Sequence, residues 1–234
     1  AGMNPYNYCA GNPVMLVDED GRKFTKAAES EVQILEQEIN NKISDIEKAD
    51  KPKRWHESKL NKLKDVQKEI NELRESKQVY DLRTYRKEVN SNESDYRGFV
   101  SYDQENDQFV INVNTWRDAT TEGSELGAFA HELKHAYQFE TGRFSFSFDK
   151  KNNVTEIPGI LYDLTDEEEA FARGSLFGGV GCPDMRIYKI SSKDKHIDIP
   201  NGIQQIKFYN LKNPNSSKFR GQIFSKKIKD AINK

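Results

Sequence analysis

Apolar residues recur at steps of three and four through two stretches between residues 28 and 78, and this pattern constrains the fold most. Residues 48–54, which include Pro52, separate the two stretches. Such spacing predicts two amphipathic helices joined by a turn. The apolar positions are Val32, Leu35, Ile39, Ile43 and Ile46, then Leu60, Leu63, Val66, Ile70 and Leu73. Because each apolar seam is narrow, we expect residues 25–80 to form a long antiparallel helical hairpin that packs on itself. A coiled coil that binds a partner is the alternative.

The overall charge argues against several classes of function. The 234 residues carry 36 Lys and Arg against 38 Asp and Glu, so we expect no nucleic-acid partner. No window has the run of about 18 apolar residues that a membrane span needs. The first residues lack a basic segment followed by an apolar one, which predicts no signal peptide in this chain. The two cysteines, Cys9 and Cys182, are too few for a disulfide framework and are interpreted as free thiols.

Residues 81–234 mix strand and helix patterns, so the predicted fold class is α+β. Apolar runs at residues 97–102 and 108–114, joined by polar residues, predict a β-hairpin. Helices are expected from about Glu122 to Glu140 and from near Thr165 to the Gly178-Gly179 pair. The remaining expected elements are strands at residues 14–17, 185–190, 196–199 and 203–209, a loop at 143–148, a polar turn at 149–153 and a basic helix at about 225–234.

The first of these two helices contains the sequence HELKH at residues 131–135. Its histidines, His131 and His135, are four residues apart, so both lie on one helix face and their ring nitrogens can converge on a metal ion. Glu132 projects beside them and can take a proton from a metal-bound water. The flanking residues 127–130 are small or apolar, which indicates a buried helix whose polar groups need partners. A chance match on an amphipathic helix is the alternative.

A catalytic zinc ion usually has three protein ligands and one open position, so a third ligand is required. His196 is one candidate, but it lies in a strand-like run among charged residues. The helix near Thr165 offers Glu167, Glu168 and Glu169. Thr165 and Glu168 have the spacing of a capping box, which would turn Glu168 toward the start of the helix.

Helical spacing favours Glu167 over Glu169 as that ligand. Glu167 shares a face with Ala170 and Gly174, whose small side chains would let this helix approach the HELKH helix closely. Glu169 shares a face with Arg173 and bulkier residues.

This part of the chain resembles the gluzincin peptidases, in which HExxH is joined by a later Glu-x-x-Ala, here Glu167 and Ala170. The resemblance implies a zincin-like metallopeptidase domain over residues 81–234, in which a small sheet packs on the HExxH helix. It implies Zn²⁺ held by His131, His135 and Glu167. It further implies that residues 109–114 supply the edge strand that pairs with an extended peptide substrate.

One position departs from the gluzincin pattern. Several members place Asp four residues after the ligand glutamate to orient the first histidine, and this chain has Phe171 there. A partner for that histidine must come from elsewhere, and metal affinity depends on such partners.

The resemblance implies a mechanism of hydrolysis. Zinc would lower the pKa of its bound water toward ~7 and polarise the scissile carbonyl. Glu132 would accept the water proton and pass it to the leaving amine. Tyr137 and Tyr162 are candidate oxyanion donors, and ordinary packing is the alternative for both.

Residues 1–24 resemble the end of an Rhs repeat-associated core. The matching elements occur in family order, as Tyr6-Asn7-Tyr8, Asn12-Pro13 and Asp20-Gly21-Arg22, although the usual Asp-Pro-Asp-Gly reads Asp18-Glu19-Asp20-Gly21 here. In Rhs-type polymorphic toxins the segment after this junction is a variable C-terminal effector. Short metallopeptidase toxins of this kind often have a helix that begins His-Glu-Leu-x-His-Ala, as residues 131–136 do. A disordered N-terminal extension is the alternative.

These resemblances together predict an endopeptidase that is secreted or delivered as part of a larger bacterial surface or secreted protein. Its expected partners are a protein or peptide substrate and a cognate immunity protein. Two alternatives remain: a zinc hydrolase of non-peptide amides, and a non-catalytic interaction module with a decayed HExxH site and the helical hairpin as its binding element.

Overall fold

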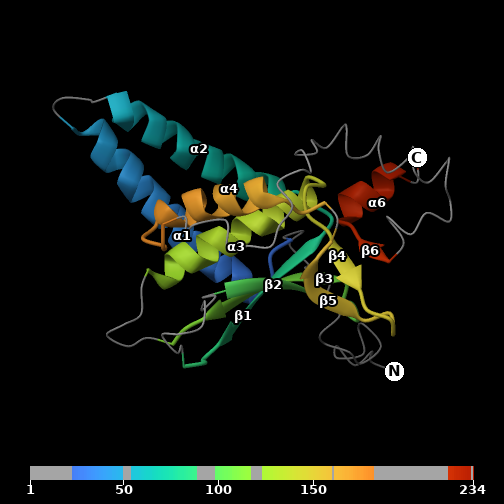
Figure 1. The fold of residues 1–234 in the computed structure, drawn as a ribbon. Coiled ribbons are helices and arrows are strands. Elements are labelled where there is room, and N and C mark those ends of the chain that lie inside the picture. The colour runs from blue at the N-terminus through green and yellow to red at the C-terminus, as the bar shows by residue number, and fades with distance from the viewer. Residues whose placement is uncertain are drawn as a thin grey trace, which may run out of the picture.

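The computed structural model describes residues 23–49, 54–88, 98–116, 123–159, 161–181, 221–232 and 234. These residues form a mixed α+β fold with two small sheets and five helices (Figure 1), which confirms the predicted fold class. The strands expected at residues 14–17 and between residues 185 and 209 lie outside the described residues, as do residues 1–22. The division into domains at residues 1–24, 25–80 and 81–234 stays a prediction.

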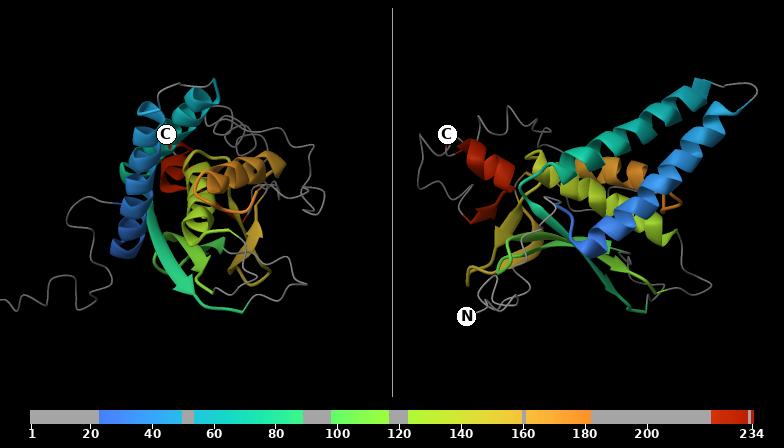
Figure 2. Two further views of the ribbon diagram at one scale, coloured as in Figure 1. Left: turned by 90° about the vertical axis from the view of Figure 1, so that its left-hand side faces the viewer. Right: turned by 180° about the vertical axis from the view of Figure 1, so that it is seen from behind.

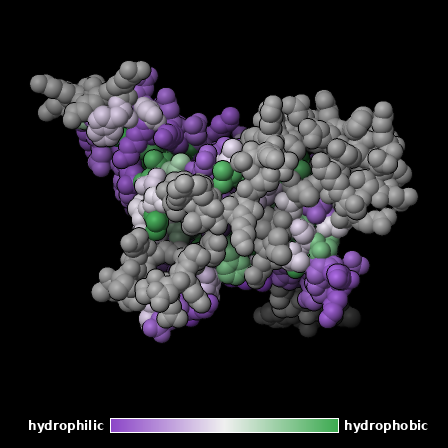
Figure 3. Space-filling model, viewed as in Figure 1, coloured by the Kyte–Doolittle hydropathy of each residue, from purple (hydrophilic) through white to green (hydrophobic). Residues whose placement is uncertain are grey.

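The predicted helical hairpin is confirmed as α1 (Lys26–Glu47) and α2 (Arg54–Arg74). Thr25 caps α1 through a hydrogen bond from the Ala28 backbone N–H to its hydroxyl. The two helices bury their seams against each other and the body, with Val32, Leu35, Ile39, Leu63, Val66 and Ile70 fully buried. Their outer turns project beyond the rest of the molecule (Figure 2). We call this projecting pair, α1 and α2, the arm. Its visible surface is mostly hydrophilic (Figure 3), as the charged composition of the segment requires.

The first sheet has the strand order β1-β3-β2, with β1 at Val79–Tyr85, β2 at Gly98–Asp103 and β3 at Gln108–Asn114. Strands β2 and β3 pair antiparallel, which confirms the predicted hairpin, and β1 pairs parallel to β3. The expectation that residues 109–114 form an edge strand is wrong, because β1 occupies the second side of β3. β1 was not predicted, since its polar and exposed residues Arg83 and Thr84 obscure the apolar alternation of a strand.

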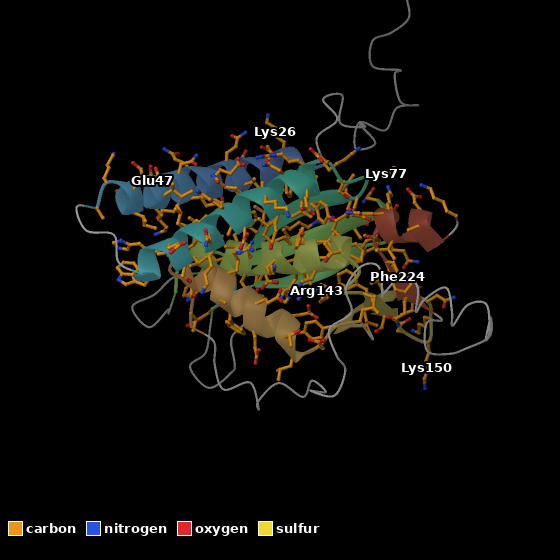
Figure 4. All side chains as sticks on the ribbon, turned by 90° about the horizontal axis from the view of Figure 1, so that it is seen from above. Lys26, Glu47, Lys77, Arg143, Lys150 and Phe224 are labelled. Atoms are coloured by element: carbon orange, nitrogen blue, oxygen red, sulfur yellow. The ribbon has the colours of Figure 1, made fainter. Side chains whose placement is uncertain are left out.

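Helix α3 (Glu125–Glu140) packs on one face of this sheet and is the most buried helix of the described fold. Phe139 of α3 lies 5.1 Å from Phe109 of β3, measured between ring centroids, and Phe146 lies 5.6 Å from both. Tilted aromatic contacts of this kind each add about 0.5–1.5 kcal/mol to the burial of their rings. Seen from above, α1, α2, α3 and α4 follow one another across the molecule (Figure 4), and both α1 and α2 contact α3.

The second sheet contains β4 (Phe146–Phe148), β5 (Val154–Pro158) and β6 (Gln222–Ile223), with β4 in the centre. The expectation of a loop over residues 143–148 is therefore wrong for its last three residues, whereas the turn at 149–153 is confirmed. Helix α4 (Leu164–Ser175) follows β5, and α6 (Lys226–Ile232) closes the fold. Among the described helices, none has the length and hydropathy that a membrane crossing requires.

Candidate metal centre

Helix α3 begins where its sequence supplies a cap. The Ser124 hydroxyl accepts a hydrogen bond of 2.8 Å from the Gly127 N–H, so the first helical residue is Glu125, three residues after the predicted start. At the other end, Gly142 adopts a φ of +78°, a conformation that favours glycine, and the helix stops as predicted. The HELKH sequence thus occupies the two middle turns of a well-defined buried helix.

Both histidines of the motif project from the same face of α3. Their Nε2 atoms lie 3.2 Å apart, and the two rings meet edge to face. The His135 residue is 3% exposed, whereas the His131 side chain retains 14% exposure. The pair therefore lies just beneath the surface, with His131 the more accessible of the two side chains.

The structure brings Glu167 of α4 to these two rings. Its carboxylate oxygens lie 3.4 Å from His131 Nε2 and 3.2 Å from His135 Nε2. Among the described residues, His131, His135 and Glu167 form the one group of three or more side chains that could bind a metal ion together. The three residues expected as ligands thus lie together, although their binding of a metal stays a prediction.

Close approach of α4 to α3 depends on Gly174. A Cβ atom on Gly174 would lie 2.8 Å from the Gly127 carbonyl oxygen and 3.3 Å from His131 Cβ. A side chain there would displace the backbone of one helix. The small face predicted for α4 is therefore the face that meets the HELKH helix.

The start of α4 differs from the prediction. Asp163, not Thr165, is the N-cap, and it forms a reciprocal capping box with Asp166. Thr165 lies inside the first turn, because the helix begins one residue earlier, at Leu164. The predicted capping box of Thr165 and Glu168 is therefore wrong, and Glu168 is exposed to solvent.

The spacing of the three side chains fits one tetrahedral metal ion. The two Nε2 atoms lie 3.2 Å apart, Glu167 Oε1 lies 3.2 Å from that of His135, and Glu167 Oε2 lies 3.4 Å from that of His131. Bonds of about 2.0–2.1 Å from zinc to nitrogen or oxygen, arranged tetrahedrally, separate neighbouring ligand atoms by roughly 3.3 Å. Two imidazoles and one carboxylate are also a donor set that zinc accepts in catalytic sites.

The electrostatics of the cluster favour a cation. Burial opposes charge on His135, but the carboxylate of Glu167 raises the pKa of this histidine to about 9. Burial likewise opposes charge on Glu167, but the two histidines hold the pKa of its carboxyl well below its usual range. The carboxylate is thus ionised and needs positive charge beside it, from a protonated imidazole or from a metal ion.

Three further side chains surround these ligands. The Phe171 ring, at the position where several gluzincins have Asp, packs edge-on against His131 at 4.5 Å between centroids. The Tyr162 hydroxyl donates a short hydrogen bond to Glu167 Oε1. Gln138 contacts His135 Nδ1 through its side-chain oxygen. Tyr162 thus holds the glutamate, which is a different contact from the oxyanion role considered for it.

Glu132 lies under β2 and is 6% exposed. A Cβ atom on Gly98, the first residue of β2, would lie 2.7 Å from Glu132 Cγ and 2.8 Å from Oε1. The glutamate therefore occupies the space that a side chain at residue 98 would fill. Burial raises the pKa of Glu132, and the nearby histidines offset only part of that shift.

Glu169 makes contacts away from the candidate ligands. It pairs with Arg143 at 2.7 Å and with Lys134 at 3.4 Å. Lys134 of α3 pairs with Glu69 of α2 at 2.9 Å, and Arg173 of α4 pairs with the same glutamate at 2.8 Å. A network of charged side chains thus joins α2, α3 and α4.

Tyr137, the other candidate oxyanion donor, does not reach this cluster. The Tyr137 hydroxyl donates to Glu72 of α2, which gives it a contact with the arm. His56 lies on α2 against Trp55, and His196 lies outside the described residues. Gln138 and Gly98 were missed, because an amide and a glycine carry no signal of their role until the fold places them beside His135 and Glu132.

Comparisons with protein-family models, with curated proteins and with solved structures found no match to this chain. The arrangement of its own residues is therefore the basis on which a function is proposed.

Proposed function

We propose that this chain is a zinc-dependent peptidase, with Zn²⁺ held by His131, His135 and Glu167. The observation that carries the proposal is the convergence of the three side chains: the two Nε2 atoms lie 3.2 Å apart, about one edge of a zinc tetrahedron, and each has an oxygen of Glu167 within 3.4 Å. Zinc bound there would activate a water molecule and polarise the carbonyl of the bond to be cleaved.

Glu132 acts as the general base in this proposal. Its buried carboxylate lies close enough to both histidines and to Glu167 for their charges to shift its pKa, and that pKa is raised. A carboxylate beside the metal-bound water can accept its proton and pass it to the leaving amine.

A peptide substrate is supported by the strand next to Glu132. Strand β2 is an edge of the first sheet among the described strands, and its first residue lies against the glutamate. An extended chain can pair with such an edge through its backbone. This arrangement of a small sheet on the motif helix is what a zincin-like fold would provide, with β2 in the role expected for residues 109–114.

The setting that we propose is the effector end of an Rhs-type polymorphic toxin, which rests on the resemblance of residues 1–24. A toxin of this kind is delivered as part of a larger bacterial protein and is neutralised by an immunity protein. Its test is protection: an adjacent open reading frame that relieves toxicity of the expressed chain supports this setting, and an expressed chain that is not toxic contradicts it.

Zinc content tests the metal site. We expect about one zinc per chain in the purified protein and its loss in His131→Ala, whereas His56→Ala on the arm should retain it. Glu167→Gln and Glu169→Gln form a matched pair, and only the first should lower zinc affinity. Protein that holds no zinc, with a melting temperature unchanged by chelator, would refute the proposal and favour the non-catalytic interaction module.

Cleavage of a peptide library tests the reaction. Glu132→Gln should keep the fold and the zinc but reduce kcat by about 10²–10⁴-fold, since it removes only the general base. Full activity in that variant would refute the role of Glu132. Hydrolysis of small amides without hydrolysis of any peptide would instead indicate a non-peptide amide hydrolase.

A further inference from the structure

Gln138 joins the two helices that carry the candidate ligands. It is fully buried on α3, one turn after His135. Its Oε1 lies 2.7 Å from His135 Nδ1, and its Nε2 lies 2.9 Å from the backbone carbonyl oxygen of Asp166, the residue before Glu167. One amide therefore contacts both a ligand ring and the backbone next to a ligand carboxylate.

The Asp166 carbonyl determines how the amide is oriented. A carbonyl oxygen can only accept a hydrogen bond, so the Gln138 atom that faces it must be the NH₂ group. The other end of the amide is then the oxygen, which can only accept. His135 Nδ1 must consequently carry a proton and donate it to Gln138.

This orientation leaves the other ring nitrogen of His135 available. With the proton on Nδ1, the neutral ring has a lone pair on Nε2, which points at the Nε2 of His131 and the carboxylate of Glu167, each 3.2 Å away. That lone pair can accept a hydrogen bond from His131 Nε2 or bind a metal ion. The tautomer that Gln138 selects is thus the one that a metal ion needs.

We propose that Gln138 is a positioning residue for the metal centre: it holds His135 in the Nδ1–H tautomer and ties the HELKH helix to the start of α4. The inference rests on the proposed zinc site and adds a residue that the HExxH pattern does not contain. It supplies one orienting partner, for His135, in a chain where Phe171 stands in place of the usual Asp for the first histidine.

Two substitutions of similar volume separate positioning from packing. Gln138→Met removes the acceptor and the donor, and we expect the dissociation constant for zinc to rise about 10–100-fold. Gln138→Glu keeps an acceptor for Nδ1 but places a carboxyl group against the Asp166 carbonyl. It should retain zinc affinity within about threefold of the wild type, although its melting temperature falls.

Tyr80→Phe is the matched control. It removes a buried hydrogen bond between β1 and the last turn of α3, since the Tyr80 hydroxyl donates to Glu140 at 2.7 Å. Stability should fall in this variant while zinc affinity stays unchanged. The measurements are zinc titration by competition with a chelating dye, thermal unfolding of the metal-free protein, and the visible spectrum of the Co²⁺-loaded protein, which should change in Gln138→Met alone.

The outcomes distinguish the inference from the proposal beneath it. Wild-type protein that binds no zinc overturns both. Wild-type protein that binds zinc, with Gln138→Met equally tight or with all three variants losing affinity in proportion to stability, overturns the positioning role only. Weakened binding in Gln138→Met with retained binding in Gln138→Glu supports it.

Discussion

Single residues without charge control the geometry of the candidate centre. Gly98 leaves room for the Glu132 side chain, and Gly174 lets α4 reach α3 beside His131. In both cases the missing Cβ atom is replaced by part of another element. These glycines matter because they leave space for neighbouring atoms. Neither has the positive φ that would itself favour glycine.

Substitution of Gly98 tests this arrangement. In Gly98→Ala the new Cβ would meet Glu132 Cγ at 2.7 Å and the Asn112 carbonyl oxygen at 2.9 Å, so the glutamate must move. Peptidase activity should fall by about tenfold or more, because a misplaced general base loses its reach to the proton. Zinc content should stay unchanged.

Gly181→Ala is the control for that experiment, since nothing lies within 4 Å of a Cβ at Gly181. Both variants are assayed for kcat and zinc content. Unchanged activity in Gly98→Ala would show that the base has freedom to relocate, contrary to the geometry.

The residues with distinctive chemistry could be predicted from the sequence, and the residues that support them could not. His131, His135 and Glu167 were identified by helical spacing, and the structure brings them together. Gln138 lies on α3 itself, but its role depends on a carbonyl of α4, 28 positions later in the chain. A contact of that range leaves no pattern in a single sequence.

At the level of elements, the arm supports the helices behind the candidate centre. Glu69 of α2 accepts from Lys134 of α3 and from Arg173 of α4, and all three side chains are largely buried. The arm is therefore connected to the body by charges as well as by its apolar seam.

Glu69→Gln should destabilise the protein. The substitution leaves two buried cations without their shared carboxylate, although Lys134 keeps its contact with Glu169. Removal of one partner from a buried hydrogen bond costs about 1–3 kcal/mol, and we expect a loss in this range in the free energy of unfolding. Urea denaturation of the metal-free protein measures it.

Gln67→Ala provides the comparison on the same helix. Its side chain donates to Asn40 across the arm in an exposed position, so its loss should change stability by about 0.5 kcal/mol or less. Equal effects of the two substitutions would mean that the charges around Glu69 contribute no more than a surface contact.

Periodicity predicted the long elements and failed for the short ones. The two helices of the arm, α3 and the β2–β3 hairpin were expected because each repeats an apolar spacing over several turns or residues. Strand β1 has exposed positions in its second half, and β4 has only three residues, so neither presents a sufficient pattern. Their strand conformation comes from pairing with distant segments.

At the scale of the whole molecule, a buried carboxylate links the segment that follows α2 to the end of α3. Glu140 is 1% exposed, and its Oε2 accepts hydrogen bonds from Ser76 and Tyr80, each 2.7 Å long. Burial raises its pKa, and the two hydroxyl donors offset only part of that shift. The folded protein therefore binds a proton at Glu140 more tightly than the unfolded chain does.

This shift predicts a dependence of stability on pH. The stabilisation from protonated Glu140 is complete below the pKa of the unfolded chain, about 4.3, and is lost as the pH rises through the raised pKa. Glu140→Gln carries no such proton, so its stability relative to the wild type should increase between pH 4 and pH 7. The increase is about 1.4 kcal/mol for each unit by which the pKa is raised.

Denaturation of both proteins across that pH range measures the difference. Ser76→Ala, which removes one donor to the same oxygen, should instead steepen the dependence. A difference between Glu140→Gln and the wild type that stays constant with pH would contradict the raised pKa.

The base of the arm has a consequence for how this molecule can change in size. The chain leaves the sheet at Phe24 and returns at Tyr80, and these two residues are joined by a parallel bridge, with Tyr80 bonded to Lys23 and Thr25. Residues 25–79 thus begin and end at neighbouring positions on the sheet. Whole helical turns can therefore be inserted or deleted at the outer end, which changes the reach of the molecule and leaves the register of the sheet intact.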